Sequence, residues 1–328
     1  MEKSKSLIFF RRILSSLLVL FLLTTFIFII IRLSPGDPSQ KYLSPKLSME
    51  LHKEISNSYQ LDKSISEQYF AFVKNIFLGD LGISYSYRKS VVSVIGEYLP
   101  FTIVFSLIAF IIQLLVSMLL VYLSIKYKDR AIDKILQSSS FVIYAIPVFL
   151  SSVFLIYLFS YNINLFSSSG LRSFNFEEFS FFEKILDYAK HLTLPLIAVS
   201  LTGIPIYYKY LRDAIISNMN SNYVLNLNSI GIEKKKIIFK HVLPNSINAV
   251  IAVAGIELGI LLGGAVIIET IFSLPGMGQL SMNAVLARDY PLIIGCTITA
   301  GVLMLCVNII ADICRVLIDK RLLKELMT

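Results

Sequence analysis

The side chains that could perform covalent chemistry in this sequence are few, and they are not spaced as a catalytic set. The sequence contains no GxxxxGK[ST] phosphate loop, no HExxH zinc motif and no GxSxG nucleophile turn. Its cysteines lack CxxC spacing and its histidines are scattered, which argues against a metal site. These residues are Cys296, Cys306, Cys314, His52, His191 and His241. We therefore expect no catalytic residue, no metal and no cofactor in this chain.

One acidic side chain, Glu257, lies well inside an apolar run of about residues 247–268. An ionisable group at that depth is costly in a bilayer, so it lines a cavity or finds a partner. Two interpretations stay open: Glu257 contacts a cationic group of a translocated solute, or it is a hydrogen-bonded packing residue. The same run carries Gly255, Gly259 and Gly263, a spacing that lets two helices approach closely.

A polar stretch of residues 223–244, YVLNLNSIGIEKKKIIFKHVLP, lies between two long apolar runs. Four apolar side chains recur at helical spacing and predict one helical face; they are Met219, Tyr223, Leu227 and Ile230. Gly231 most easily adopts the left-handed conformation that ends a helix, and a second short helix is expected to run as far as Pro244. The lysines at 234–236 suit anionic headgroups or an acidic partner. This helix–glycine–helix element is a candidate docking site.

The composition indicates a membrane protein. The 328 residues are 55% hydrophobic and 16% charged, with a mean hydropathy of +0.72, whereas soluble domains carry about a quarter charged residues. The formal net charge of +8 would suit nucleic acid, but the basic residues lie between apolar runs rather than on one polar domain. We therefore expect a lipid bilayer around the chain and no nucleic-acid partner.

Six apolar runs predict an all-α polytopic membrane protein with about six transmembrane helices, each span requiring about 20 residues. The runs cover approximately residues 13–31, 100–125, 137–161, 193–208, 247–268 and 292–317. The first run is longer than the apolar core of a signal peptide, which has roughly 7–15 residues, so it is expected to be retained. Pro195 and Pro205 predict kinks in the fourth run.

The distribution of basic residues predicts the orientation. With the amino terminus inside, 18 of the 30 Lys and Arg residues lie on the inner side, as the positive-inside rule requires. Both termini and the polar stretch of residues 223–244 are therefore expected in the cytoplasm. We divide the chain into residues 1–99, the first helix with a long extracytoplasmic segment, and residues 100–328, a core of five spans. The core includes the cytoplasmic helical element at about residues 219–244.

Several motifs, in order and spacing, resemble those of the permease subunits of binding-protein-dependent ABC importers, in the dipeptide/oligopeptide/nickel branch. The resemblance covers nearly the whole chain. In the middle stretch, a turn with small residues and Gly231 is followed after nine residues by His241-Val242-Leu243-Pro244. The other motifs are Pro35-Gly36-Asp37-Pro38, Gly79-Asp80-Leu81-Gly82-Ile83-Ser84, Leu99-Pro100-Phe101-Thr102-Ile103 and ETIFSLPGMGQL, which begins at Glu269 and ends at Leu280.

The resemblance implies the type I fold of ABC importer permeases and a transport function in the cell membrane, without covalent chemistry on this chain. It implies four kinds of partner: a second homologous permease subunit, two ATPase subunits that carry ATP and magnesium, an extracytoplasmic solute-binding protein and the bilayer. The element at residues 219–244 is then the coupling helix that sits in a groove of an ATPase subunit. The residues assigned to coupling are Tyr223, Asn226, Leu227, Asn228, Ser229, Gly231, His241, Leu243 and Pro244.

Three positions depart from the family pattern. Leu227-Asn228-Ser229 stands where an Ala-Arg-Ala-like run is usual, and Asp319-Lys320-Arg321 stands where Asp-Pro-Arg is common. Glu257 occupies a position where an uncharged residue is expected. Loss of the usual arginine removes a charged contact from the coupling element.

Alternatives stay open at two levels. Within the importer class, the solute is a short peptide or nickel or another metal carried as a chelate, because a chelate needs no His or Cys ligands from the chain. Outside that class, the chain would be a self-contained secondary transporter, a membrane enzyme or a channel. The lack of paired reactive groups argues against an enzyme, and the coupling-type element argues against a secondary transporter. Transport that survives removal of ATP would indicate a channel.

Overall fold

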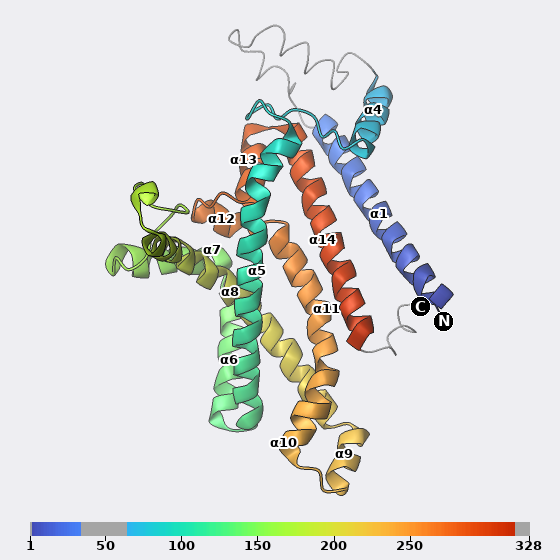
Figure 1. The fold of residues 1–328 in the computed structure, drawn as a ribbon, viewed down its shortest axis with the longest axis vertical. Helices are drawn as coiled ribbons and strands as arrows, with labels where there is room; N and C mark the ends of the chain where they lie inside the picture. Colours follow the sequence, from blue (N-terminus) through green and yellow to red (C-terminus); the bar gives the residue numbers. More distant parts are fainter. Residues whose placement is uncertain (1, 34–63, 319–328) are drawn as a thin grey trace.

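The computed structural model describes residues 2–33 and 64–318, with the side chains of the first helix described over residues 13–30. The motif at residues 35–38 and the departure at residues 319–321 lie outside the described residues. Within these ranges the chain is helical apart from loops and one isolated bridge between Ile83 and Ser90. Figure 1 shows α9 (Asn222–Ser229) at one end of the long axis and α13 (Met277–Ala287) near the other. We call these the α9 end and the α13 end.

Among the described residues, five helical segments are long and apolar enough to cross a membrane, and a bent pair makes a sixth. The continuous segments are α1 (Glu2–Leu33), α5 (Val91–Lys126), α8 (Phe181–Met219), the run Lys234–Ile271, and α14 (Tyr290–Ile318). The run Lys234–Ile271 comprises α10 (Lys234–Ile237), η3 (Ile238–Val242), α11 (Leu243–Leu262) and α12 (Val266–Ile271). The segments follow the order of the six predicted runs, so the prediction of an all-α polytopic protein is confirmed.

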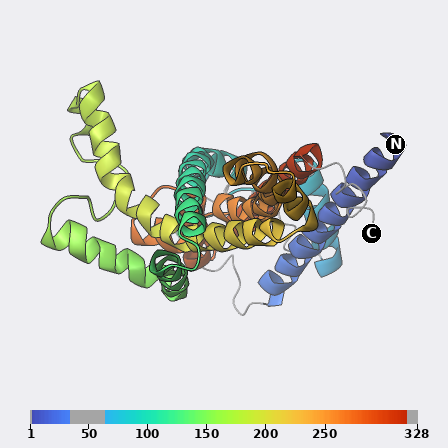
Figure 2. The ribbon, with the colours of Figure 1, turned by 90° about the horizontal axis from the view of Figure 1, so that it is seen from below.

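The third predicted run is bent by 97° between α6 (Ala131–Ala145) and the pair formed by α7 (Val148–Leu155) and η1 (Ile156–Asn162). Pro147 lies at the bend and has no N–H to continue a helix. Ile146, which precedes it, adopts an extended conformation, as residues before proline do. η1 and the first part of α8 reach out to one side as two arms (Figure 2), whereas α7 packs against α8 and α12. This bend was not predicted from the sequence.

Other prolines lie inside continuous helices. α8 remains helical through Pro195 and Pro205 and is longer than the predicted run of residues 193–208. α5 begins at Val91, where the Ser90 side chain accepts a hydrogen bond from the Ser93 N–H at 3.3 Å, and it includes Pro100 as an interior residue. The helix that carries the second predicted run therefore starts before residue 100, and the proposed division between residues 99 and 100 falls inside it.

The glycines of α11 allow a close approach to α14. A Cβ atom on Gly255 would lie 2.6 Å from the Cβ of Ala311, and a Cβ on Gly259 would lie 3.0 Å from the Cγ of Met304. Such distances are shorter than ordinary van der Waals contacts, so side chains at these positions would push the helices apart. The close packing predicted from the glycine spacing is therefore confirmed, and it occurs within the subunit.

A buried apolar cluster at the α9 end joins five helices. Its members include Val121 of α5, Leu211 of α8, Val224 of α9, Ile237 of α10 and Val250 of α11, each at most 5% exposed. We call this group the α9-end cluster. Because one continuous group of side chains contacts all five helices, α9 and α10 are held firmly against the long helices.

Candidate functional site

A glycine turn ends α9 where the element protrudes from the α9 end (Figure 1). The Ile232 N–H donates to the Leu227 carbonyl at 3.2 Å, and the Gly231 N–H donates to the Asn228 carbonyl at 3.0 Å. These two bonds form a Schellman motif, which requires a left-handed residue at position 231. Gly231 has a φ of +80°, so the predicted helix end is confirmed. Leu227 and Ile232 both pack against the α9-end cluster and supply the apolar contact of the motif.

The element differs from the sequence prediction on each side of the turn. α8 ends at Met219, so this residue does not share a helix with Tyr223 and Leu227, although all three pack against the α9-end cluster. Ile230 is 72% exposed and does not belong to the inward face, so the prediction that it shares a helical face with Tyr223 and Leu227 was wrong. The predicted helix end at Pro244 was also wrong, because α10 continues through η3 into α11. The wide π-helical turn of η3 makes room for the proline ring.

The nine residues assigned to coupling divide into an outward and an inward group. The exposed, outward residues are Asn226, Asn228, Ser229, Gly231 and Pro244. The half-buried, inward residues are Tyr223, Leu227, His241 and Leu243. Of the inward side chains, those of Tyr223, Leu227 and Leu243 pack against the α9-end cluster, whereas the outward group is exposed.

Three apolar side chains on this element are exposed, and the sequence did not predict that they would be. Leu225 is 59% exposed, Ile230 is 72% exposed and Phe239 is 51% exposed. We call these three residues the exposed apolar group. These side chains thus remain exposed on an element whose other apolar side chains pack inward. The exposure of Leu225 could have been predicted from the sequence, because this apolar residue does not share the helical face of Tyr223 and Leu227.

Hydrogen bonds tie α9 to the end of α8 and to the start of α11. The Asn218 Nδ2 donates to the Ser246 Oγ at 3.1 Å, and the Tyr223 hydroxyl donates to the Asn218 Oδ1 at 3.4 Å. The Asn245 Nδ2 donates to the Tyr223 hydroxyl at 3.4 Å. Tyr223 therefore fixes the position of the element between two long helices.

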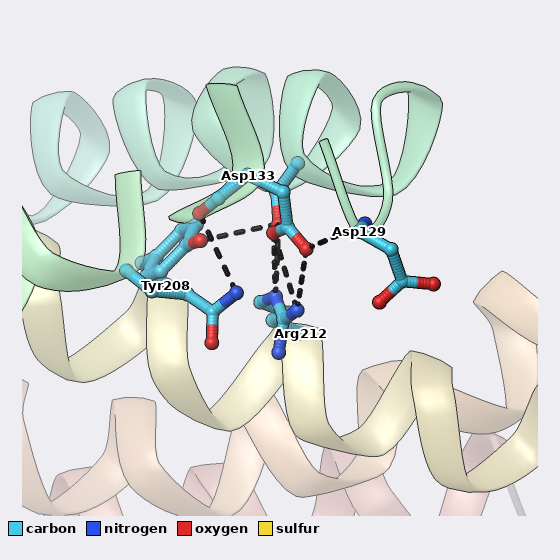
Figure 3. A network of polar contacts seen from close by, with 6 residues as sticks. Asp129, Asp133, Tyr208 and Arg212 are labelled. Carbon is cyan, nitrogen blue, oxygen red and sulfur yellow. Dashed lines mark hydrogen bonds and ion pairs between the residues drawn. The ribbon is translucent and has the colours of Figure 1, made fainter. Parts of the chain in front are cut away.

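A buried ion pair joins α6 and α8 beside the α9-end cluster (Figure 3). The Asp133 carboxylate accepts bonds of 3.0 and 3.1 Å from the Arg212 Nη2, and the two side chains are 2% and 13% exposed. Ser124 of α5 donates to the same carboxylate at 2.5 Å. The Ser124 Oγ also accepts from the Arg212 Nε at 2.8 Å and from the Tyr208 hydroxyl at 3.1 Å. No sequence signal marked the pair, because its members are 79 residues apart.

A cleft of about 560 Å³ opens between α6, α8 and α11. Its lining includes Tyr144 of α6, Lys209 and Arg212 of α8, and Glu257 of α11, which is half-buried. The volume lies within the range of small-molecule sites, about 300–1,000 Å³. Glu257 therefore lies on a cavity wall, as the solute-contact interpretation requires.

Two of the sequence motifs meet at the α13 end. Glu269 is fully buried, and its carboxylate accepts the Gly278 N–H at 2.6 Å and the Gln279 N–H at 3.0 Å. Thr102 donates to the Glu269 carboxylate at 3.4 Å and accepts the Met277 N–H at 2.7 Å. Both side chains thus pair N–H groups in the first turn of α13 that have no helical partner. These motif residues hold α13 in place.

The loop motif of residues 79–84 is fixed to α14 in a similar way. The Ser84 Oγ donates to the Asp289 carboxylate at 2.6 Å, and the Ser86 N–H donates to it at 2.8 Å. Asp289 also accepts the Leu292 N–H at 3.3 Å in the first turn of α14. Burial raises the pKa of the neighbouring Tyr87 phenol above its usual value.

Comparison with known proteins identifies the class of this multi-pass helical membrane protein as a transport permease. The chain belongs to the family of binding-protein-dependent transport system inner membrane components, whose family model matches residues 119–324. The N-terminal model of the same kind of membrane component matches residues 6–108. The resemblance predicted from the motifs is confirmed, and the chain is a permease rather than an enzyme.

Similar proteins include several importer permeases. The oligopeptide transport system permease protein AppB of Bacillus subtilis (strain 168) is 31% identical over 313 residues, which are 95% of this chain and 98% of that protein. The inner membrane ABC transporter permease protein YejB of Escherichia coli O157:H7 is 34% identical over 282 residues, 84% of this chain and 77% of that protein. A chain of the inward-facing MetNI methionine ABC transporter matches with a TM-score of 0.46 and 16% identity, over 72% of this chain and 95% of that chain.

Proposed function

We propose that this chain is one of two permease subunits of an ATP-driven importer that moves short peptides into the cell. Family membership supports an importer permease, and the names of AppB and of the dipeptide transport system permease protein DppB of Lactococcus lactis favour peptides over a nickel chelate. The DppB protein is 28% identical over 306 residues, 93% of this chain and 95% of that protein. ATP and magnesium would bind to two partner ATPase subunits, and a solute-binding protein would deliver the peptide at the α13 end.

In this proposal the α9 end faces the cytoplasm and docks on an ATPase subunit. The start of α1 and the end of α14 lie toward the α9 end, which supports cytoplasmic termini (Figure 1). The observation that carries the docking is the exposed apolar group on an element whose other side is braced by Asn218 and Tyr223. ATP-driven closure of the ATPase subunits would push this braced element and rotate the long helices attached to it.

Replacement of Leu225 and Ile230 by aspartate should reduce the amount of ATPase that co-purifies with the permease at least about tenfold. An unpaired charge in an apolar contact costs more than the roughly 1.4 kcal/mol that corresponds to a tenfold change in affinity. The measurement is affinity purification of the tagged chain from membranes that contain the whole importer, with ATPase quantified per permease. The control variant Leu225→Met with Ile230→Met keeps the apolar surface and should retain the ATPase.

Retention of the ATPase by the aspartate variant would show that the exposed apolar group is not the docking surface. A native chain that binds no ATPase and accumulates solute without ATP would instead be a secondary transporter. Uptake of a labelled nickel chelate without uptake of labelled peptides would overturn the peptide assignment.

We further propose that Glu257 contacts the amino group of the peptide in the cleft. Glu257→Gln should lower the uptake of peptides with a free amino terminus about tenfold, because a hydrogen bond to a charged group contributes about 1.5–3 kcal/mol. Uptake of amino-acetylated peptides should not change, and Glu257→Asp should retain most of the activity. Unchanged uptake by Glu257→Gln at every pH would make Glu257 a packing residue.

A further inference from the structure

The ion pair of Asp133 and Arg212 connects α6 to α8. The Asp133 carboxylate accepts hydrogen bonds from the Arg212 guanidinium, the Ser124 hydroxyl and the Asp129 N–H, the last at 3.2 Å. Figure 3 shows Arg212 and Asp129 beside the Asp133 carboxylate, between the helices. The acceptor sites of the buried carboxylate are thus occupied in one fixed geometry, and this geometry joins α5, α6 and α8.

α6 contributes the apolar side chain of Leu136 to the packing around the α9-end cluster. Of its residues, all of which are described, Asp133 is the one that is fully buried. Apolar side chains along the rest of the helix are largely exposed, including Ile135 at 64%, Phe141 at 75% and Tyr144 at 62%. The position of α6 relative to α8 therefore depends on the Asp133 carboxylate together with the contact of Leu136.

On the α8 side, the pair is continuous with the element that protrudes at the α9 end. Leu211 and Ile215, which flank Arg212 on α8, pack in the α9-end cluster with Val224 of α9 and Ile237 of α10. Arg212 also lines the cleft, whose walls include α6 and α8. A path of direct contacts thus runs from α9 through α8 and the ion pair to α6 and its bent arm.

An ion pair is a poor means of stabilising a buried contact, because the cost of removing two charges from water offsets most of their attraction. Apolar residues of similar size stabilise such a site as well or better. A multiply bonded arginine–carboxylate contact differs from an apolar one in fixing the orientation of both partners. An ion pair between Asp133 and Arg212 therefore fixes the geometry of this contact more than it stabilises the fold.

We propose that Asp133 and Arg212 are a positioning pair that makes α6 move together with α8 when an ATPase acts on the α9 end. The two walls of the cleft that these helices form then shift as one body against α11. This inference rests on the proposed importer function. Arg212 lines the cleft, but the role proposed for the pair is to hold α6 in register with α8 and not to bind the ATPase or the solute.

The first test uses the whole importer reconstituted in vesicles and compares the native complex with two variants, each substituted at both Asp133 and Arg212. The apolar variant Asp133→Leu with Arg212→Met should preserve assembly and thermal stability but lower the peptide imported per ATP hydrolysed about fivefold. The reversed pair Asp133→Arg with Arg212→Asp should recover part of that ratio. A native ratio in the apolar variant would show that the pair is merely structural.

The second test measures distance distributions between spin labels on exposed positions of the two helices, Ser138 of α6 and Ser217 of α8. In the otherwise native importer we expect one narrow distribution that is the same without nucleotide and with bound ATP. A native distance that changes on ATP binding would overturn the inference, whatever the variants do. Failure of the native complex to couple uptake to ATP would instead overturn the importer proposal.

Discussion

Glu269→Ala is expected to prevent stable folding of the α13 end. The substitution removes the acceptor for the Gly278 and Gln279 N–H groups and for the Thr102 hydroxyl, all at a site where Glu269 is fully buried. Each buried donor left without a partner costs about 1–3 kcal/mol, and the missing side chain leaves a cavity as well. The sum is comparable with a large part of a typical folding stability of about 5–15 kcal/mol.

The measurement for Glu269 is the fraction of permease that stays monodisperse in detergent after heating. Glu269→Gln keeps one carbonyl acceptor and should lose less stability than Glu269→Ala. The matched control is Glu257→Ala, which removes an acid from the same helical run, Lys234–Ile271, at a half-buried cleft position. Equal stability of Glu269→Ala and Glu257→Ala would contradict the role assigned to Glu269.

The close packing around the Glu269 carboxylate explains why its motif is rich in glycine. A Cβ on Gly276 would lie 2.4 Å from the Glu269 carboxylate, and a Cβ on Gly278 would lie 2.7 Å from the backbone of Val266. The motif that contains these glycines was recognisable in the sequence, but the carboxylate that they surround was not. The burial of that carboxylate also involves Thr102, which is 167 residues away in the sequence.

Local signals in the sequence predicted local structure well. The apolar runs predicted the long helices, and Gly231 predicted the end of α9, because both depend on near neighbours in the chain. The helix end expected at Pro244 failed because η3 widens before it, and no single residue type signals a π-helical turn. Pro147 carried a signal for the bend between α6 and α7, but the apolar run around it concealed the break.

In the candidate site, too, features that depend on neighbouring residues in the sequence were predictable, and features that depend on distant residues were not. The polar stretch of residues 223–244 was recognisable, since its polarity contrasts with the flanking runs. The inward role of Tyr223 and the exposure of Leu225 depend on where α8 ends and α11 begins. The pairing of Asp133 with Arg212 depends on helix packing across 79 residues, which one sequence does not encode as a pattern.

Gly255→Ala is expected to separate α11 from α14 and to destabilise the permease by about 1–3 kcal/mol, the usual cost of overpacking. The new Cβ would lie 2.6 Å from the Cβ of Ala311 and 3.3 Å from the Oδ1 of Asn308, so the helices must move apart. Their separation would also loosen the contact between Gly259 and Met304 one turn away. The measurement is the midpoint of thermal unfolding in detergent.

A second substitution tests whether the clash with Ala311 is the cause. Ala311→Gly in the Gly255→Ala background removes the colliding methyl group and should restore most of the lost stability, giving a coupling energy of about 0.5–3 kcal/mol in a double-mutant cycle. The control is Gly96→Ala in α5, where an added Cβ meets nothing within 4 Å. That variant should be neutral or stabilising because alanine has the higher helix propensity. Additive effects of the Gly255 and Ala311 substitutions would mean that the glycine spacing does not set the distance between the two helices.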